Sequence, residues 1–158
     1  MVRLVPMTDL EYQAYLAPAV RDYADEKVAA GNWQPTEALE RSAQEFQKLL
    51  PDGVASPGNY LFKIEEQTLG ATVGMIWLAR ILQGAHPIIF IYDFRIDEAY
   101  RRKGYGEQAM RAAEEQAKAL GFDTIALHVF GHNHAARALY EKLGYEITNI
   151  NMAKKLTA

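Results

Sequence analysis

The chain has 158 residues, of which 49% are hydrophobic and 23% charged, values ordinary for a globular protein with one sizeable core. Its net charge of −3 gives no general electrostatic footprint for nucleic acid or for an anionic membrane surface. No apolar run approaches the roughly 20 residues that span a bilayer, and no basic-then-apolar segment opens the chain, so we expect a soluble cytoplasmic protein.

The absence of cysteine excludes a disulfide framework, a thiolate zinc site and a cysteine nucleophile. Serine occurs only at Ser42 and Ser56, and neither lies in a Gly-x-Ser-x-Gly motif. Any group transfer is therefore expected to avoid a covalent serine or cysteine intermediate.

The N-terminal part predicts one strand followed by two helices. Residues 2–5 form a short strand-like run, and Thr8 with Glu11 three residues later is a capping-box pattern that opens a helix. Pro18 is expected to kink or divide this helix, because proline cannot donate the helical hydrogen bond. A second helix is predicted over 36–50.

Three strand-like segments follow, over 60–65, 71–82 and 88–97, separated by turn residues. This spacing predicts an antiparallel meander. The third segment is almost entirely apolar or aromatic from Ile88 to Tyr92, which is typical of a strand buried on both faces.

The C-terminal part alternates helices and strands. A helical period over 106–120 is followed by Gly121, which suits a left-handed C-terminal cap. A strand over 124–130, a short helix over 133–143 and a last strand over 145–152 complete a mixed α/β sandwich.

The turn Arg101-Arg102-Lys103-Gly104-Tyr105-Gly106 lies between a buried strand and an amphipathic helix. The first turn of a helix has free N–H groups and the positive end of the helix dipole, and therefore attracts anions. Glycines let phosphate oxygens approach the backbone, and three cations lie beside them. From these six residues alone, a phosphate site and a plain turn with solvated basic side chains are both open.

The glycines also match a Gly-x-Gly-x-x-Ala dinucleotide pattern formed by Gly104, Gly106 and Ala109. In that pattern the glycines follow their strand at once, but here residues 98–103 intervene. The acidic partner should end the next strand, whereas Asp123 precedes it. A nucleotide-binding oxidoreductase domain is therefore the weaker alternative.

A second constellation places Asn133 and Tyr140 seven residues apart, so that they share one helix face. A phenol in that position could hydrogen-bond or protonate a leaving group. The structural alternative is that Asn133 caps the helix, Tyr140 packs and Gly144 terminates it.

The two motifs occur in the order strand, Arg-x-x-Gly-x-Gly, helix, strand and Asn-x-x-Ala-x-x-Leu-Tyr-x-x-x-Gly-Tyr. Taken together, this order closely resembles the GCN5-related N-acetyltransferase (GNAT) family. The likeness is dense over 88–152, where it is most similar to ribosomal-protein N-terminal-alanine acetyltransferases. It implies the acyl-CoA N-acyltransferase fold, an α/β fold whose mixed central sheet has splayed central strands flanked by helices. It also implies one domain over 1–158, with an acceptor-side half over 1–87 and an acetyl-CoA-binding half over 88–158.

The resemblance implies a role for each matching position. Backbone groups of the central strand would bind pantetheine and the acetyl carbonyl, the amides of the basic turn would hold the pyrophosphate, and Tyr140 would face the sulfur as general acid. The implied acetyl-CoA-binding residues are Phe94, Arg95, Ile96, Arg101, Arg102, Lys103, Gly104, Tyr105, Gly106, Glu107, Asn133 and Tyr140.

In the implied reaction an amine attacks the thioester directly, and a backbone N–H holds the developing oxyanion. The family often takes its base from a glutamate on the central strand, but Phe90 stands there. His128, five residues before Asn133, is a candidate base because neutral imidazole suits pH 7, although it could equally be a half-buried strand histidine. Asp93 could act instead through water.

The expected partner is a primary amine acceptor, either a protein N-terminus or a small molecule, with no nucleic acid and no membrane. Dimers are common in such proteins, so a homodimer is a further expectation. No metal is expected, because His132 and His134 have no carboxylate or thiolate at ligand spacing. A non-catalytic acyl-CoA-binding regulatory module remains the main alternative function.

Overall fold

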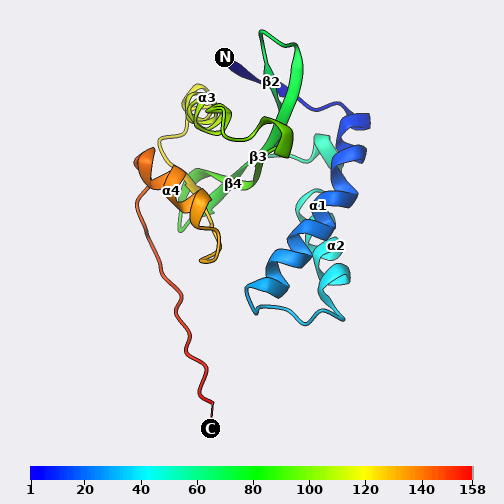
Figure 1. Cartoon of the computed structure of the whole chain (residues 1–158). Coiled ribbons are helices and arrows are strands. Elements are labelled where there is room, and N and C mark those ends of the chain that lie inside the picture. Colours follow the sequence, from blue (N-terminus) through cyan, green and yellow to red (C-terminus); the bar gives the residue numbers. More distant parts are fainter. Residues whose placement is uncertain (158) are drawn as a thin grey trace.

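The computed structural model describes residues 1–157. These residues form five strands and four α-helices arranged around one twisted sheet (Figure 1). The strands are β1 (Val2–Pro6), β2 (Asn59–Glu66), β3 (Ala71–Gln83), β4 (His86–Ile96) and β5 (Ile125–Leu127). The helices are α1 (Asp9–Ala29), α2 (Ala38–Leu49), α3 (Tyr105–Ala119) and α4 (His134–Lys142), with 3₁₀ turns η1 (Gly53–Ala55) and η2 (Glu98–Tyr100).

The strands follow the order β1-β2-β3-β4-β5, so the predicted meander is confirmed. The first four strands pair antiparallel, and β5 joins β4 in parallel after the α3 crossover. This sheet differs from the doubly wound parallel sheet of dinucleotide-binding domains. The nucleotide-binding oxidoreductase alternative therefore does not fit the fold.

Helices cover both faces of the sheet. One core lies between the sheet and α3, and its buried members are Phe62, Ile64, Val73, Ile76, Leu78, Ile89, Ile91, Ala109, Met110, Ala113 and Ala117. The other lies between the opposite face and the α1–α2 pair, with Tyr12, Tyr15, Ala19, Phe46, Leu50, Leu61, Met75 and Trp77. The alternation of side chains along β2 and β3 sends neighbouring residues into different cores.

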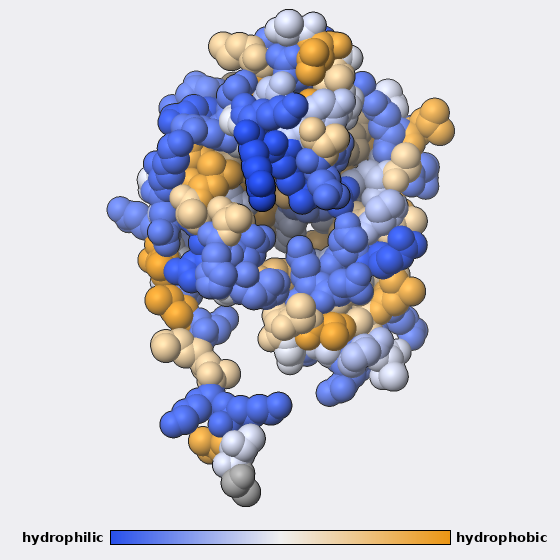
Figure 2. Space-filling model, in the orientation of Figure 1, coloured by the Kyte–Doolittle hydropathy of each residue, from blue (hydrophilic) through white to orange (hydrophobic). Residues whose placement is uncertain are grey.

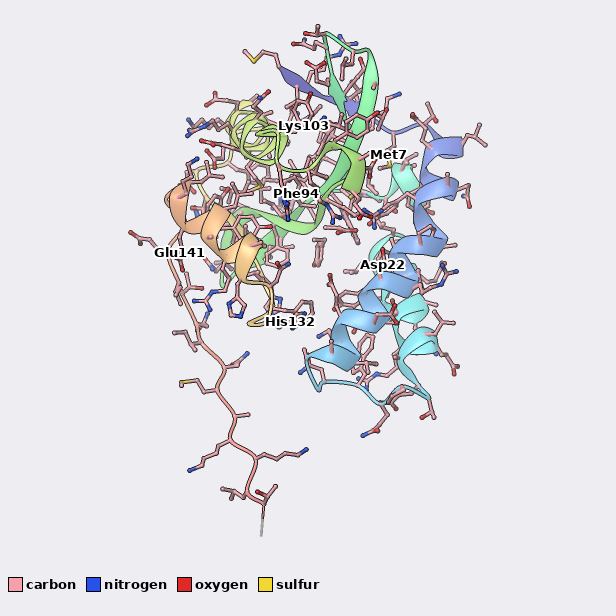
Figure 3. All side chains as sticks on the ribbon, in the orientation of Figure 1. Met7, Asp22, Phe94, Lys103, His132 and Glu141 are labelled. Atoms are coloured by element: carbon pink, nitrogen blue, oxygen red, sulfur yellow. The ribbon has the colours of Figure 1, made fainter. Side chains whose placement is uncertain are left out.

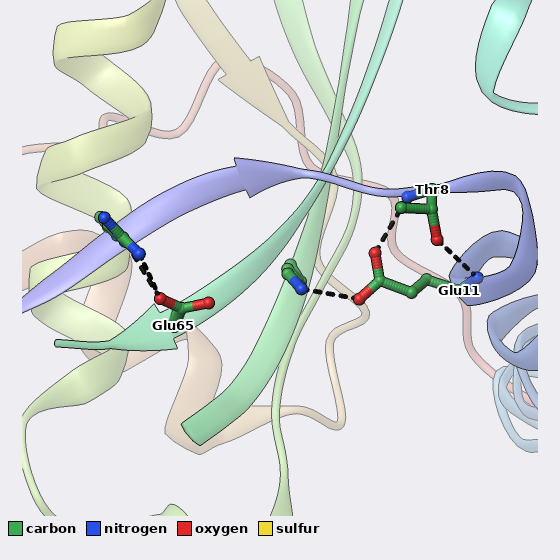
Figure 4. A network of polar contacts seen from close by, with 5 residues as sticks. Thr8, Glu11 and Glu65 are labelled. Atoms are coloured by element: carbon green, nitrogen blue, oxygen red, sulfur yellow. Dashed lines mark hydrogen bonds and ion pairs between the residues drawn. The ribbon is translucent and has the colours of Figure 1, made fainter. Parts of the chain in front are cut away.

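The start of α1 is fixed by the predicted capping box. The Glu11 N–H donates to Thr8 Oγ1 at 3.2 Å, and the Thr8 N–H donates to Glu11 Oε1 at 2.9 Å (Figure 4). The second oxygen of Glu11 accepts a 2.8 Å hydrogen bond from Lys63 Nζ on β2. The cap therefore also ties the helix to the sheet, next to the Arg3–Glu65 ion pair.

Pro18 does not divide α1, which continues as one helix of 21 residues. Of the expected kink or division, the division does not occur, because Tyr15 and Ala19 on either side of the proline are both buried and hold the helix on the sheet. The C-terminal end of α3 is as predicted, with Gly121 in the left-handed conformation at φ 93°.

Three strand predictions need correction. Residues 145–157 form neither helix nor strand, so the last strand expected over 145–152 is absent, and β5 pairs over only three residues of the expected 124–130. The strand buried on both faces is β3, from Val73 to Ala79, whereas Tyr92 of β4 is 36% exposed. The exposed side of β4 forms part of the cleft described below.

No helix within residues 1–157 is long and apolar enough to cross a membrane.

Candidate active site

A cleft of about 1090 Å³ lies between the α1–α2 layer and the C-terminal ends of β4 and β5. Figure 2 shows this face hollowed at its middle, with hydrophilic residues around the opening. In Figure 3, Asp22 on α1 lies across this space from Phe94 and His132. The cleft thus collects side chains from both halves of the sequence.

A β-bulge in β4 shapes the floor of the cleft. Trp77 pairs with Asp93 and Leu78 pairs with Ile91, so Tyr92 is an extra residue on β4. A bulge bends its strand and re-aims the side chains that follow it. As a result Phe90, Tyr92 and Asp93 all line the cleft, which strict alternation would forbid.

The Asp93 side chain is half-buried at the floor of the cleft. Tyr15 Oη donates a 2.6 Å hydrogen bond to Asp93 Oδ2. Burial raises the pKa of Asp93 above its ordinary value, although the Tyr15 hydrogen bond and the nearby Arg95 charge act in the opposite direction. Burial also raises the pKa of Tyr15, so this phenol keeps its proton and remains the donor.

The basic turn leads into α3 with free backbone donors. Arg102 and Gly104 both adopt positive φ, 64° and 83°, and Gly104 is the N-cap with no side-chain cap. The first helical hydrogen bond runs from the Gln108 N–H to the Gly104 carbonyl. Within residues 1–157 the N–H groups of Tyr105, Gly106 and Glu107 have no acceptor, so this helix end can receive an anion.

The side chains of this turn do not all face the cleft. Of the predicted residues here, Arg101, Arg102, Gly104, Tyr105 and Gly106 line it, whereas Lys103 and Glu107 do not. The guanidinium of Arg101 donates to the Ile96 carbonyl at 2.8 Å and thereby braces the turn against β4.

The Glu107 side chain has a structural position. It accepts hydrogen bonds of 3.0 Å from both Lys142 and Arg111, and these partners lower the pKa of Glu107. The bond to Lys142 links α3 to α4. Any contact of Glu107 with an anion must therefore come from its backbone N–H.

The strands β4 and β5 separate beside this turn, and the predicted splay is confirmed. They pair only between 89–91 and 125–127. Beyond Ile91, the backbone groups of β4 that face β5 have no strand partner within the described chain, and Phe94, Arg95 and Ile96 line the opening. A free strand edge of this kind can accept an extended amide-bearing chain.

Gly74 holds this part of β4 in place. A Cβ on Gly74 would lie 2.1 Å from the Arg95 carbonyl oxygen, too close for any other residue. The glycine therefore lets β3 approach residues 95 and 96 of β4.

At the start of α4, Asn133 serves as the N-cap, and its Oδ1 accepts from the Ala136 N–H at 3.2 Å. Both Asn133 and Tyr140 line the cleft. The Tyr140 ring packs edge-on against Tyr145, with 5.9 Å between centroids. Burial raises the pKa of Tyr140 to about 12, with smaller contributions from Asp93 and Glu26, so the phenol is protonated at neutral pH.

His128 lies on the solvent-exposed wall of the cleft, edge-on to Phe130. Partial desolvation, together with the positive charge of Lys27, lowers the pKa of His128. The imidazole is therefore neutral at pH 7. His132 stacks on Phe130, with 5.5 Å between the ring centroids. Within residues 1–157 no group of three histidine or carboxylate side chains is placed to hold a metal ion.

The sequence analysis expected the acceptor side in residues 1–87 but did not single out the carboxylates that α1 and α2 bring to the cleft. Asp22 and Glu26, one helical turn apart, line it together with Glu45 from α2. Asp22 pairs with Arg95 across the cleft at 2.7 Å, and burial raises the pKa of Glu26. The four-residue spacing of Asp22 and Glu26 was visible, but nothing in the sequence showed which face of α1 would meet the cleft.

The cleft therefore has two chemically different ends. The α3 end offers backbone N–H groups and arginines to an anion, whereas the α1–α2 end offers carboxylates. Tyr140, Asp93 and His128 line the wall and floor of the same cleft.

Comparison with known proteins agrees with this architecture. The family model of the acetyltransferase (GNAT) family matches residues 19–145. The chain is 40% identical over 157 residues to YycN of Bacillus subtilis, described as an uncharacterized N-acetyltransferase, with 98% of this chain and 99% of YycN covered. It is 37% identical to YdgE of the same organism, which carries the same description, over 97% of each chain.

The crystal structure of YycN superposes with a TM-score of 0.93 at 39% identity and covers all of both chains. An acetyltransferase structure from Pyrococcus furiosus, at 24% identity, shares the fold with a TM-score of 0.69 over 99% of this chain and 100% of that one. The chain belongs to the GNAT family of acetyltransferases and is an N-acetyltransferase.

Proposed function

We propose that this enzyme transfers the acetyl group of acetyl-CoA directly to a primary amine on a positively charged acceptor, at the junction of Tyr140 and Asp93. The observation that carries the proposal is the single cleft with an anion-receiving end and an acidic end. The C-terminal half, 88–158, would supply the cofactor side, and the N-terminal half, 1–87, would supply most of the acceptor side.

The residues at the α3 end fit the phosphate groups of acetyl-CoA. The free N–H groups of Tyr105, Gly106 and Glu107 converge at one helix N-terminus, where a pyrophosphate is favoured. Gly104 leaves open space beside them, since a Cβ there would meet nothing within 4 Å. Arg101 and Arg102 add positive charge, while Lys103 lies outside the cleft lining.

The pantetheine arm would lie along the unpaired edge of β4. Backbone groups of Phe94, Arg95 and Ile96 that β5 leaves free can pair with its amides as a further strand would. Asn133 uses its Oδ1 to cap α4, so its Nδ2 is the atom left to contact the ligand.

Acetyl-CoA supplies an activated acetyl carbonyl and a thiolate leaving group. During transfer a nitrogen–carbon bond forms, the carbon–sulfur bond breaks, and the amine loses one proton. Tyr140, protonated because its pKa is about 12, would give its proton to the departing thiolate. A backbone N–H of β4 would hold the developing negative charge on the carbonyl oxygen.

The proton of the amine needs an acceptor, and Asp93 is the group that the geometry favours. Its charge contributes to the raised pKa of Tyr140, so the two groups are electrostatically coupled. Burial raises the pKa of Asp93, which makes its carboxylate a better base, acting through water. His128 is the second candidate, because its lowered pKa keeps the imidazole neutral and able to accept a proton at pH 7.

The acceptor end favours a cation because its charged lining is mainly acidic. The carboxylates there are Asp22, Asp25, Glu26, Glu45 and Asp93, against the cations Lys27 and Arg95. Arg95 is already paired with Asp22. An acceptor with a second positive charge, such as a polyamine or an aminated sugar, would therefore bind better than a neutral amine.

The test measures release of free CoA thiol with a panel of amines matched in length, each with one or two positive charges. We expect doubly charged amines to have a KM at least about tenfold lower. Glu26→Gln should reduce that preference, whereas Glu40→Gln, an exposed change on α2 outside the cleft lining, should not.

The same experiment separates the enzyme from a non-catalytic acyl-CoA-binding module. Thermal-shift titration with acetyl-CoA and with NADH identifies the cofactor class. Binding of acetyl-CoA without thiol release for any amine in the panel would favour the module and contradict the proposed acceptor.

A further inference from the structure

Tyr92 has an aromatic surface that the proposed mechanism does not use. The residue is 36% exposed, although Ile91 before it and the Trp77 ring that it contacts are 5% and 2% exposed. Its ring packs on Trp77 with 4.7 Å between centroids and on Phe90 with 4.9 Å. These two contacts hold the ring in place, and Tyr92 lines the cleft.

The β4 bulge places this ring beside the proposed base. In a regular strand, the side chains of residues 92 and 93 would lie on opposite faces of the sheet. The bulge instead brings both Tyr92 and Asp93 to the cleft. An amine held at Asp93 therefore has its carbon chain next to the Tyr92 ring.

From Tyr92 a series of ring contacts crosses the floor of the cleft to α1. Trp77 packs on Phe46 with 5.7 Å between centroids, and Phe46 packs edge-on to Tyr23 with 6.1 Å. All of these rings line the cleft, with Trp77 and Phe46 buried and Tyr23 half-buried. The acceptor end thus has an aromatic floor that runs from β4 to α1.

Carboxylates lie at both ends of this aromatic floor. Asp93 follows Tyr92 on β4, and Glu26 lies one helical turn beyond Tyr23 on α1. Glu45 of α2 lies close to Tyr23, whose pKa is raised by burial and by the Glu45 charge. Negative charge is therefore available on either side of the aromatic surface.

This arrangement matches a molecule with an apolar stem and a positive charge at each end. Methylene groups gain free energy when an aromatic surface covers them, and ammonium groups are attracted both to ring faces and to carboxylates. We propose that Tyr92 determines acceptor specificity by packing against the carbon chain of an unbranched diamine or polyamine. This inference rests on the proposed function, in which one amine is acetylated beside Asp93, and it places the second amine at Glu26 and Glu45.

The polar side chains of the cleft disfavour a hydroxylated acceptor such as an aminated sugar. Within the described residues the lining has no serine, threonine or glutamine, and its one asparagine, Asn133, lies at the start of α4. Sugar hydroxyls placed over the Tyr92 ring would lose water without gaining a partner, which costs free energy. The aromatic floor therefore separates two acceptor classes that the charge of the cleft alone does not.

The first measurement compares kcat/KM for terminal diamines from propanediamine to hexanediamine and for monoamines from propylamine to hexylamine. We expect kcat/KM to rise about two- to fourfold per added methylene in both series. The monoamine series isolates the carbon chain from the second charge. A diamino sugar with the same two charges should have a kcat/KM at least about tenfold below that of hexanediamine.

Variants at Tyr92 test whether its ring is the cause. Tyr92→Ala should reduce the increase to less than about 1.5-fold per methylene, whereas Tyr92→Phe keeps the ring and should retain the increase. The control Leu82→Ala, which should also retain it, removes a side chain that is 59% exposed on β3 and outside the cleft lining. Glu26→Gln should weaken the preference for diamines but leave the increase among monoamines.

A second measurement does not require acetyl transfer. In saturation-transfer NMR, irradiation of the aromatic protons of the enzyme–CoA complex transfers saturation to the methylene protons of hexanediamine that contact them. The methylene signal should be alike in the parent and Tyr92→Phe and should fall at least about threefold in Tyr92→Ala. Thermal unfolding of each variant checks that it is folded.

The outcomes distinguish this proposal from the proposed function. Diamines preferred over monoamines with no rise along either series, or a rise that Tyr92→Ala retains, would overturn the role of Tyr92 and leave the cationic acceptor intact. A diamino sugar that matches hexanediamine would overturn the unbranched class. If no amine is acetylated, the proposed function fails. Saturation that Tyr92→Ala reduces then still supports the Tyr92 contact, and unchanged saturation overturns it.

Discussion

Tyr15 and Asp93, 78 residues apart in sequence, are joined by a 2.6 Å hydrogen bond from the phenol to the carboxylate. The contact fastens α1 to the bulged part of β4, and it holds a half-buried carboxylate in the same cleft as Tyr140. One short contact therefore links the packing of the N-terminal helix to the chemistry of the C-terminal half.

The change Tyr15→Phe removes this donor and should alter the pH dependence of acetyl transfer. Because the hydrogen bond stabilises the ionised form, its loss raises the pKa of Asp93 further. The rising acid limb of the kcat/KM profile should move to higher pH, and stability should fall by about 1–3 kcal/mol. Tyr12→Phe changes the neighbouring buried ring and should leave the profile in place. An unmoved acid limb in Tyr15→Phe would show that Asp93 is not the base.

Asp93→Asn should raise the stability of the protein while it lowers its activity. The pKa of Asp93 is raised in the folded protein, so the folded state holds the proton more tightly than the unfolded state does, and the ionised carboxylate opposes folding. That opposition is absent below about pH 3.9, the ordinary pKa of an aspartate, and develops as pH rises through the raised value. Urea unfolding should therefore show Asp93→Asn gaining stability relative to the parent between pH 3 and pH 7, while kcat falls about 10²-fold or more. A relative loss of stability over that interval would contradict the burial argument.

Tyr140→Phe should lower kcat with little effect on cofactor binding. Positioned proton donation contributes about 10²–10⁴-fold, and the ring that packs against Tyr145 is retained in phenylalanine. Calorimetry should give a Kd for CoA within about twofold of the parent. The matched control is Tyr145→Phe, which loses only the hydrogen bond to Glu114. Equal effects of the two changes on kcat would remove Tyr140 from the mechanism.

Gly104→Ala and Gly121→Ala form a matched pair at the two ends of α3. Both glycines have positive φ, 83° and 93°, and a Cβ at either position would meet nothing within 4 Å. Alanine should therefore cost a similar free energy of unfolding at each, about 1–2 kcal/mol. Only Gly104→Ala should weaken CoA binding, by about tenfold or more, because Gly104 precedes the free N–H groups. Similar CoA affinities in both variants would place the pyrophosphate elsewhere.

Gly74→Ala tests how the β4 edge is positioned. A new Cβ 2.1 Å from the Arg95 carbonyl must push the backbone of residues 95 and 96 outward. We expect a stability loss of about 1–3 kcal/mol and weaker CoA binding. Ala79→Gly, on the same strand but paired with Phe90, should lose stability without the change in affinity. A folded Gly74→Ala protein with the CoA affinity of the parent would contradict the role given to the β4 edge.

The features that the sequence predicts correctly are those whose cause is local. The Thr8–Glu11 capping box and the Gly121 cap involve residues within one turn, and the meander follows from turn residues between apolar runs. The GNAT resemblance rests on two motifs with fixed spacing around Gly104 and Tyr140, and the family comparison confirms it.

The features that it misses depend on contacts between distant segments. The bulge at Tyr92 exists because its neighbours Asp93 and Ile91 pair with the consecutive residues Trp77 and Leu78, and it cannot be seen in the apolar run of β4 itself. Asp22 and Glu26 become part of the cleft only because α1 packs across β4. The strand expected over 145–152 has suitable residues but no partner in its own chain, and pattern alone cannot supply one.

The central claim is that one cleft takes acetyl-CoA at the α3 end and a cationic amine at the α1–α2 end. The most direct measurement incubates the parent enzyme with a doubly charged amine and acetyl-CoA. Mass spectrometry quantifies the acetylated amine, and a thiol assay quantifies the free CoA. The account predicts equal amounts of both products, with transfer reduced about 10²-fold or more in Tyr140→Phe. Tight CoA binding with no acetylated amine from any member of the panel would contradict it.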